Sequence, residues 1–246
     1  MSDPLIESGK TFFLESVKSR YSYNFEWLSR PIIQYPQDIV AFQEIVWKVK
    51  PDLVIETGIA HGGSLILSAS LLTLLDYCEA KESNLLIDPE KPKRKVVGID
   101  IDIRAHNLKA LNAHPLRNCI ELIEGSSIDT TVIDKVISHT KNRNCVLVCL
   151  DSNHTHDHVF AELSAYAPLV TPGSYCIVFD TVIDDLPDQL SVDRPWNKGN
   201  SPKTAVSKFL EMNHQFEIDK SFQEKLVLTV APDGYLRRIR DQKPNF

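Results

Sequence analysis

The residues with the clearest chemical purpose lie in segment 54–64, where an acid, a glycine-rich turn and a helical pattern follow one another. Glycine lets the backbone turn sharply and approach a ligand, and a helix N-terminus favours a negatively charged group. The spacing departs from the G-x-G-x-x-G fingerprint of dinucleotide-binding proteins. We predict a ligand site here, with an ordinary strand–turn–helix joint as the alternative. Its candidate residues are Glu56, Thr57, Gly58, Gly62, Gly63 and Ser64.

Further polar residues follow the later apolar runs, at the places where open α/β sheets bind ligands. Asp100 and Asp102 follow the second run, and a carboxylate there can accept hydrogen bonds from both hydroxyls of a ribose. Ser126 and Ser127 follow the third run, where they could contact an adenine ring. The alternatives are a strand-end turn for Asp100 and helix capping for the serines.

Two carboxylates, Asp151 and Asp180, end the fourth and fifth apolar runs, so we expect them at neighbouring strand tips. Unpaired carboxylates repel each other, and a divalent cation that prefers oxygen ligands, Mg²⁺, would relieve the repulsion. His154 is then a general base or a partner of these carboxylates. A Zn²⁺ or Fe²⁺ site built with His156 and His158 is the alternative, but a helix beginning near His154 would scatter the three rings.

The surrounding sequence alternates apolar runs with helical patterns. We predict strands at residues 53–56, 96–101, 120–124, 146–150 and 175–179. We predict helices at residues 5–18, 36–49, 64–77, 105–112, 129–139, 157–169 and 203–212. Residues 216–218 and 226–230 are predicted to form two more strands with a tight connection.

This alternation is typical of a doubly wound α/β fold with helices on both faces of a mostly parallel sheet. Runs 146–150 and 175–179 lack polar alternation, as expected for strands covered on both sides. The prediction is a seven-stranded sheet with an antiparallel C-terminal hairpin. We divide the chain into an N-terminal helical and aromatic extension, residues 1–35, and a ligand-binding domain, residues 36–246.

The composition limits the class of protein. The chain has 246 residues, of which 43% are hydrophobic, and a net charge of −6 argues against a nucleic-acid-binding surface. The basic segment 91–95 is predicted to be a solvated loop. Five cysteines without disulfide-framework spacing favour a reducing compartment. Without a signal-like N-terminus or a bilayer-length apolar run, we expect a cytoplasmic protein with no integral membrane segment.

Segment 54–64 has the form of the first motif of S-adenosylmethionine-dependent methyltransferases, in which an acid faces the methionine ammonium. Taken with the residues that follow the later strands, it resembles the cephalosporin hydroxylase / rhamnosyl O-methyltransferase family over residues 44–236. The residues that carry the resemblance, besides those of the segment, are Gly98, Ile99, Asp100, Gly125, Ser126, Ser127, Asp151, His154 and Asp180.

The resemblance implies a class I, Rossmann-like methyltransferase fold with S-adenosylmethionine as cofactor and a Mg²⁺ site that orients a substrate hydroxyl. It implies Asp151 and Asp180 as metal ligands and Asp151, His154 and Asp180 as catalytic residues, with Asp151 also near the cofactor. One position departs from the pattern, because Phe179 stands where the antibiotic-pathway member of the family has an acid. The replacement ligands considered are water, Thr181, Asp184 and Asp185.

We therefore predict an O-methyltransferase acting on a hydroxyl of a sugar, a glycolipid or polysaccharide, or a secondary metabolite. One alternative is a cofactor-binding subunit with altered catalysis, which Phe179 favours. Another is a non-haem iron hydroxylase using Asp151, His154 and His156, which the α/β pattern disfavours.

Two segments outside the motifs are predicted to meet other molecules. Aromatic segment 21–35 and loop 194–200 are candidate substrate contacts, because sugars stack on aromatic faces and such a loop can close over a site. Core packing and a plain surface turn are the alternatives. The apolar extension, which is longer than the core fold needs, predicts a homo-oligomer.

Overall fold

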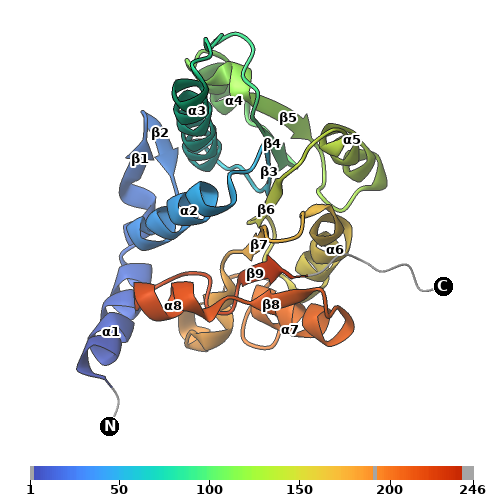
Figure 1. Ribbon diagram of the computed structural model, residues 1–246. Coiled ribbons are helices and arrows are strands. Elements are labelled where there is room, and N and C mark those ends of the chain that lie inside the picture. The colour runs from blue at the N-terminus through green and yellow to red at the C-terminus, as the bar shows by residue number, and fades with distance from the viewer. Residues whose placement is uncertain (1–2, 191–192, 240–246) are drawn as a thin grey trace, which may run out of the picture.

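A seven-stranded sheet forms the centre of the molecule, with helices on both of its faces (Figure 1). The computed structural model describes residues 3–190 and 193–239. Its strands are β1 (Phe25–Trp27), β2 (Arg30–Ile32), β3 (Leu53–Thr57), β4 (Lys95–Asp100), β5 (Ile120–Glu124), β6 (Val146–Leu150), β7 (Tyr175–Val178), β8 (Phe216–Ile218) and β9 (Tyr235–Arg238). Its α-helices are α1 (Pro4–Lys18), α2 (Pro36–Val49), α3 (Gly63–Ser83), α4 (Ala105–Asn112), α5 (Thr130–Thr140), α6 (His156–Tyr166), α7 (Pro202–Met212) and α8 (Lys220–Leu226).

The strand order in the sheet is β5-β4-β3-β6-β7-β9-β8. The five strands from β5 to β7 are parallel, and β9 runs antiparallel to both β7 and β8. This is the predicted doubly wound, mostly parallel sheet with an antiparallel C-terminal pair. The order reverses between β3 and β6, and in such sheets the crevice at the reversal binds ligands.

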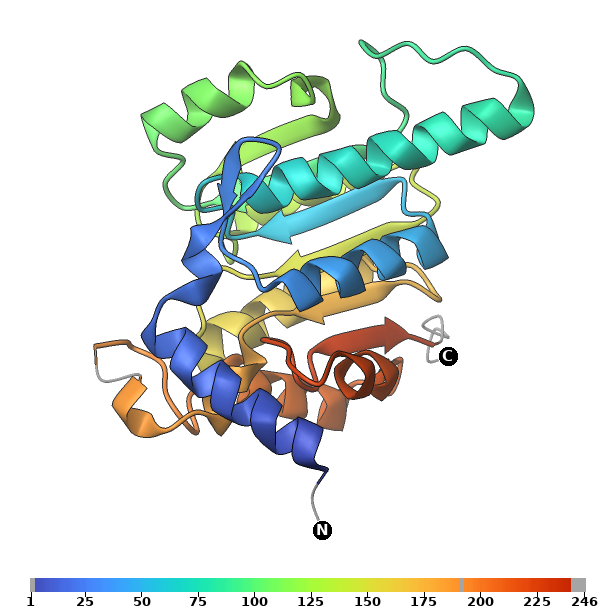
Figure 2. The same ribbon diagram turned by 90° about the vertical axis from the view of Figure 1, so that its left-hand side faces the viewer.

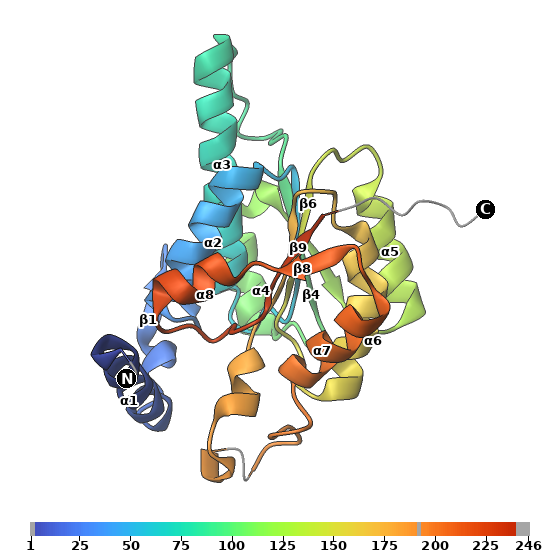
Figure 3. The ribbon, with the colours of Figure 1, turned by 60° about the horizontal axis from the view of Figure 1, so that its bottom comes forward.

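Both faces of the sheet are buried, which explains why its central strands lack polar alternation. In β3, Val54 packs into one apolar cluster, while Leu53 and Ile55 pack into the other. Helices α2, α3 and α8 cover the first face, and α5, α6 and α7 cover the second (Figure 3).

The predicted tight C-terminal connection is wrong. A helix, α8, begins after Asp219, whose side chain accepts a hydrogen bond from the Ser221 N–H at 3.2 Å. The second strand of the pair is β9 rather than residues 226–230. Leu228 and Val230 lie instead in an irregular segment and are buried. Their apolar character reflects burial in the core. The sequence pattern alone cannot distinguish a buried irregular segment from a buried strand.

Helix α3 contradicts the expectation that no segment has the length of a membrane span. It has 21 residues and a mean hydropathy of 1.2 over its most apolar stretch, of which 61% is buried inside the structure. Figure 2 shows α3 lying along the sheet, with its C-terminal part projecting beyond it. Most of its first half is apolar and enclosed by the sheet and its neighbours, so we assign the helix to the core.

The N-terminal extension packs on its own chain. Part of the aromatic segment 21–35 forms the β1–β2 hairpin, and Trp27 donates a hydrogen bond from its ring N–H to the Ser70 hydroxyl of α3 at 3.0 Å. Phe13, Ile32 and Tyr35 lie in the same apolar cluster as α2 and α3. Other apolar side chains of the extension stay exposed, among them Leu5, Phe12 and Leu28. The oligomeric state and the boundary at residue 36 stay predictions.

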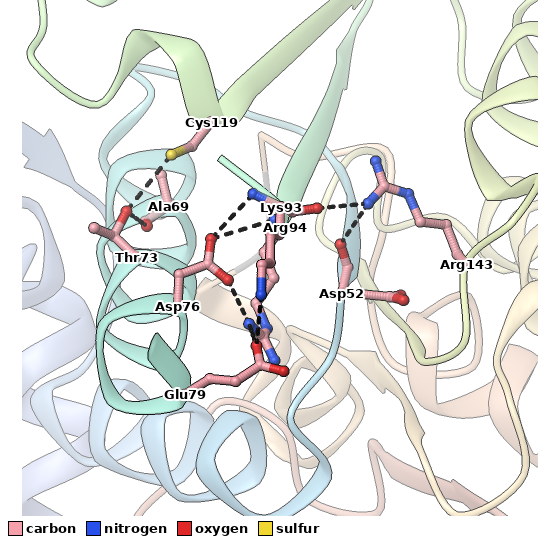
Figure 4. A network of polar contacts seen from close by, with 9 residues as sticks. All are labelled: Asp52, Ala69, Thr73, Asp76, Glu79, Lys93, Arg94, Cys119 and Arg143. Carbon is pink, nitrogen blue, oxygen red and sulfur yellow. Dashed lines mark hydrogen bonds and ion pairs between the residues drawn. The ribbon is translucent and has the colours of Figure 1, made fainter. Parts of the chain in front are cut away.

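A polar network joins α3 to the start of β4 (Figure 4). The Arg94 side chain, only 11% exposed, pairs with Asp76 and with Glu79, the latter at 2.8 Å. The Lys93 and Arg94 N–H groups also donate to Asp76, at 3.2 and 3.4 Å. The basic segment 91–95 is therefore a solvated loop only in part, because the Arg94 side chain is largely buried and paired with α3.

Replacing Asp76 by alanine should lower the free energy of unfolding by roughly 2–3 kcal/mol, because the largely buried Arg94 guanidinium would lose a charged partner. Urea denaturation measures the change. Glu82→Ala, which removes an exposed carboxylate from the same helix, is the control and should stay within about 0.5 kcal/mol of the unchanged protein. Equal losses in both variants would contradict a specific role for the Asp76–Arg94 pair.

Candidate functional site

The parallel strands carry the predicted site residues to one edge of the sheet. Because β5, β4, β3, β6 and β7 are neighbours in that order, the segments that follow them also lie side by side. Along this edge come, in order, Ser126 and Ser127, Asp100, the glycine turn, Asp151 and Asp180. The reversal in strand order falls between the glycine turn and Asp151.

The glycine turn is shaped by two close backbone contacts. Gly58 has φ +80°, and a Cβ atom there would lie 2.0 Å from the carbonyl oxygen of Asp151. A Cβ atom on Gly63 would lie 2.3 Å from the carbonyl oxygen of Pro31, in the β1–β2 hairpin. Gly63 is therefore required for packing of the extension, a reason that its place in the motif did not suggest.

Asp100 holds the glycine turn in place. Its Oδ2 atom accepts hydrogen bonds from the N–H groups of Ile59 and Ala60 at 3.0 and 3.1 Å. Its Oδ1 atom accepts from the Asp102 N–H at 3.2 Å. A carboxylate has about four acceptor positions, so Asp100 keeps capacity for the predicted ribose hydroxyls.

The serines at the end of β5 have partners within the chain. The Ser127 hydroxyl lies 3.1 Å from His158 Nε2, and the Ser127 carbonyl accepts from the Tyr166 hydroxyl at 2.6 Å. The Ser126 carbonyl accepts from the Asp129 N–H at 3.0 Å, just before α5. Neither serine caps α5, whose N-cap is Asp129, and an adenine contact stays a prediction.

Glu56 points into a pocket beside the glycine turn. Its side chain is 4% exposed, and Oε2 accepts from the Ser68 hydroxyl at 3.3 Å. Its Oε1 atom is buried without a hydrogen-bond partner in the described part of the chain. Burial raises the pKa of Glu56 to about 7, although the nearby hydroxyls of Ser64 and Ser68 oppose the shift.

The pocket has an empty volume of about 370 Å³, including its open mouth. Polar and apolar residues line it, among them Gln34, Phe42, Glu56, Leu67, Asp151 and Phe179. A buried carboxylate oxygen without a donor is costly, and a ligand that brings an ammonium group would satisfy it. The chemistry of the pocket therefore suits the amino-acid part of S-adenosylmethionine, with the glycine turn beside it.

A potential metal site lies next to this pocket. Asp151, His154 and Asp180 each offer one ligand atom, and these atoms all lie within 4.8 Å of one another. His154 Nε2 is 3.4 Å from Asp180 Oδ2. Burial, and next the charge of Asp180, raise the pKa of Asp151 well above its usual range. A divalent cation would offset the repulsion between these carboxylates, so the two carboxylates fit Mg²⁺, with the His154 ring beside them.

The other two histidines point elsewhere, so the site built from several histidines is not formed by the described residues. His156 Nδ1 lies 2.8 Å from the Thr204 hydroxyl. His158 Nε2 lies 3.1 Å from the Ser152 hydroxyl. Because α6 begins at His156, successive rings turn around the helix axis, as the pattern suggested. The same geometry removes the support for a site with two histidines and one carboxylate.

Three side chains are named above as possible metal ligands in place of an acid at position 179. All three have other partners within the chain. Asp184 accepts from the Gly199 N–H at 2.7 Å, and Asp185 pairs with Lys203 at 2.7 Å. Thr181 donates to the Pro232 carbonyl at 2.6 Å. None of them joins the potential metal site in the described structure, where His154 lies beside the two carboxylates.

Loop 194–200 covers the potential metal site from one side. The Trp196 ring packs edge-on against His154 with 4.7 Å between centroids, and Arg194 lies over Trp196 at 5.4 Å. Asp184 anchors the loop through Gly199. This position agrees with the predicted substrate-side role of the loop.

Two site residues come from segments that carried no motif. Gln34 Nε2 donates a hydrogen bond to Asp151 Oδ2 at 3.1 Å. Asp38 lines the same pocket and accepts from the Val230 N–H at 3.0 Å and the Tyr235 hydroxyl at 2.8 Å. Burial raises the pKa of Asp38 to about 6. No local sequence signal marks either residue, since both are defined by contacts with distant segments.

Comparison with known proteins identifies relatives over most of the chain. The family model Rhamnosyl O-methyltransferase/CmcI matches residues 19–239. The rhamnosyl O-methyltransferase of Mycobacterium bovis (strain BCG / Pasteur 1173P2) is 27% identical over 205 residues, covering 82% of this chain and 73% of the relative. That of Mycobacterium leprae (strain TN) is 27% identical over 215 residues, covering 86% and 82%.

Solved structures share the fold. A structure of CmcI with Mg and SAM matches with a TM-score of 0.56 and 18% identity, over 89% of this chain and 78% of that one. The apo structure of CalS11, a TDP-rhamnose 3'-O-methyltransferase, matches with a TM-score of 0.53 and 16% identity, over 98% and 97%. At these identities the likeness concerns the fold alone.

Proposed function

The chain belongs to the Rhamnosyl O-methyltransferase/CmcI family of S-adenosylmethionine-dependent methyltransferases, and on this premise we propose that it methylates a sugar hydroxyl with the help of Mg²⁺. The relatives are named for methyl transfer to a rhamnosyl group or to TDP-rhamnose, which favours a deoxysugar acceptor, free or on a larger molecule. A glycolipid, a polysaccharide or a glycosylated secondary metabolite would each present such a hydroxyl. Cytoplasmic location stays part of the proposal.

One observation carries this proposal: the unpaired Glu56 Oε1 atom lies in a pocket that also contains Asp151 of the potential metal site. Glu56 would bind the methionine ammonium, and the N-terminus of α3 would face its carboxylate. Asp100 would accept the ribose hydroxyls while it holds the glycine turn. Bound in this way, S-adenosylmethionine supplies an electrophilic methyl group on a sulfonium.

The catalytic residues would act mainly by positioning. Asp151 and Asp180 would hold Mg²⁺, which supplies a Lewis acid that lowers the pKa of the acceptor hydroxyl. His154 Nε2 would take the hydroxyl proton as the new O–C bond forms and the S–C bond breaks. Asp180, 3.4 Å from His154 Nε2, stabilises the positive charge that the ring gains. Trp196 would offer an aromatic face to the sugar.

Two measurements test the proposal together. Calorimetry should detect S-adenosylmethionine binding, and transfer of a labelled methyl group to rhamnose-containing acceptors should require a divalent cation. Absence of binding at millimolar cofactor would refute the proposed cofactor site. Binding without transfer to any sugar acceptor would instead favour a cofactor-binding subunit with altered catalysis. Phe179, 8% exposed in the pocket wall, is the observation that keeps this second function open.

A further inference from the structure

Gln34 reaches the site from outside the motif-bearing sheet. It lies between β2 and α2, and its side chain is 8% exposed. Its neighbours Ile32 and Tyr35 belong to the apolar core, which fixes the backbone on either side of it. Gln34 is one of the polar residues that line the pocket containing Glu56.

The two ends of the Gln34 amide are in different situations. Nε2 donates to Asp151 Oδ2 at 3.1 Å, so it holds one carboxylate of the potential metal site. Oε1 is buried and has no hydrogen-bond partner among residues 3–190 and 193–239. Buried polar atoms are nearly always paired, so an unpaired acceptor in a pocket wall indicates that a ligand brings the donor.

A second unpaired acceptor, Glu56 Oε1, belongs to a residue of the same pocket. An alkylammonium carries three N–H donors, more than one carboxylate oxygen can satisfy. Much of the remaining wall is apolar, including Ile39, Phe42 and Leu67, so the polar acceptors are few. The chemistry of this wall fits an ammonium bound between an acid and an amide oxygen.

The segment that carries Gln34 is braced against the glycine turn. Arg30 donates from Nε to the His61 carbonyl at 3.1 Å and from Nη2 to Asn107 Oδ1 at 2.8 Å. Asn107 in turn donates to the Ala60 carbonyl at 3.0 Å. These hydrogen bonds tie the hairpin to the turn, and so fix the segment of Gln34 relative to the strand end that carries Glu56.

We propose that Gln34 binds the cofactor ammonium through Oε1 while its Nε2 group positions Asp151, so that it links the cofactor pocket to the metal-binding carboxylates. This inference rests on the proposed function, since it assumes that S-adenosylmethionine binds with its amino-acid part in the pocket. It gives the N-terminal extension a direct part in the site.

The test compares two nucleosides, of which only one carries an amino acid on its sulfur atom. S-adenosylhomocysteine carries the ammonium, and 5′-methylthioadenosine lacks it. Calorimetry on the full-length Gln34→Met variant should show roughly tenfold or more weaker binding of the first and unchanged binding of the second. Gln34→Glu keeps an acceptor and loses the donor to Asp151, so it should bind S-adenosylhomocysteine close to normally and lose turnover.

Gln37→Met is the matched control, because Gln37 is half-buried on the next helix and is not among the pocket residues of the described structure. It should leave both affinities unchanged. Equal weakening of both nucleosides in Gln34→Met would mean a merely structural role and would overturn the inference. Normal binding of both would overturn it as well. Failure of the unchanged protein to bind either nucleoside would refute the proposed function and this inference together.

Discussion

Replacing Asp180 by asparagine should remove the dependence of methyl transfer on a divalent cation and lower turnover by roughly a hundredfold or more, since a bound metal contributes several kcal/mol to the transition state. The substitution takes one of two carboxylates from the potential metal site and leaves the size of the side chain unchanged. Asparagine is preferable to alanine here, because Asp180 has φ +55° and asparagine tolerates that left-handed conformation.

Initial rates over a titration of Mg²⁺ measure this effect, with cofactor affinity recorded in parallel by calorimetry. Cofactor affinity should change little, because Asp180 is not among the residues that line the Glu56 pocket. Asp185→Asn is the control, since Asp185 pairs with Lys203 away from the site. An Asp180→Asn enzyme with normal turnover and normal Mg²⁺ dependence would refute this carboxylate as a metal ligand.

Replacing Glu56 by glutamine should have two opposite effects. It should weaken S-adenosylmethionine binding by roughly 10- to 100-fold, because the ammonium loses a charged acceptor. It should also raise the stability of the ligand-free protein by up to about 3 kcal/mol above pH 7, where the buried Glu56 has to ionise. A variant that is more stable but binds the cofactor less tightly indicates that Glu56 serves ligand binding rather than folding.

The sign of the stability effect follows from the pKa of Glu56, which folding raises from 4.5 to about 7. Between these values the folded state binds more protons than the unfolded state, so the stability of the unchanged protein falls as the pH rises. The advantage of Glu56→Gln should therefore be small near pH 4.5 and complete above pH 7.

Urea denaturation across this pH range measures the difference between the two proteins. Glu124→Gln, at the exposed end of β5, is the control and should show no such pH-dependent gain. An advantage of Glu56→Gln that is the same at all pH values would contradict a buried, ionising carboxylate.

The amino-acid sequence determined the layered fold because the signals for it are local. The residues of β6 form an unbroken apolar run and those of β5 are mostly apolar, and the predicted bounds of both strands are the observed ones. Strands alternating with helical patterns then require parallel neighbours, which brings Asp151 and Asp180 to one edge of the sheet. The resemblance to the family, which the motifs in their order suggested, is confirmed by the family match. Residues 226–230 show where a local pattern fails. They are predicted as a strand because they are apolar, but a buried irregular segment can be equally apolar.

Only the tertiary structure decided how the site is assembled, because its hydrogen bonds join segments far apart in the chain. Gln34 and Asp151 are 117 residues apart, and no spacing rule relates them. The need for glycine at 63 comes from the carbonyl of Pro31, and the directions of the histidine rings follow from where α6 begins. Local patterns report which side chains are apolar and where the backbone turns. The partner of a polar side chain depends on the packing of whole elements, so it is set only when the chain has folded.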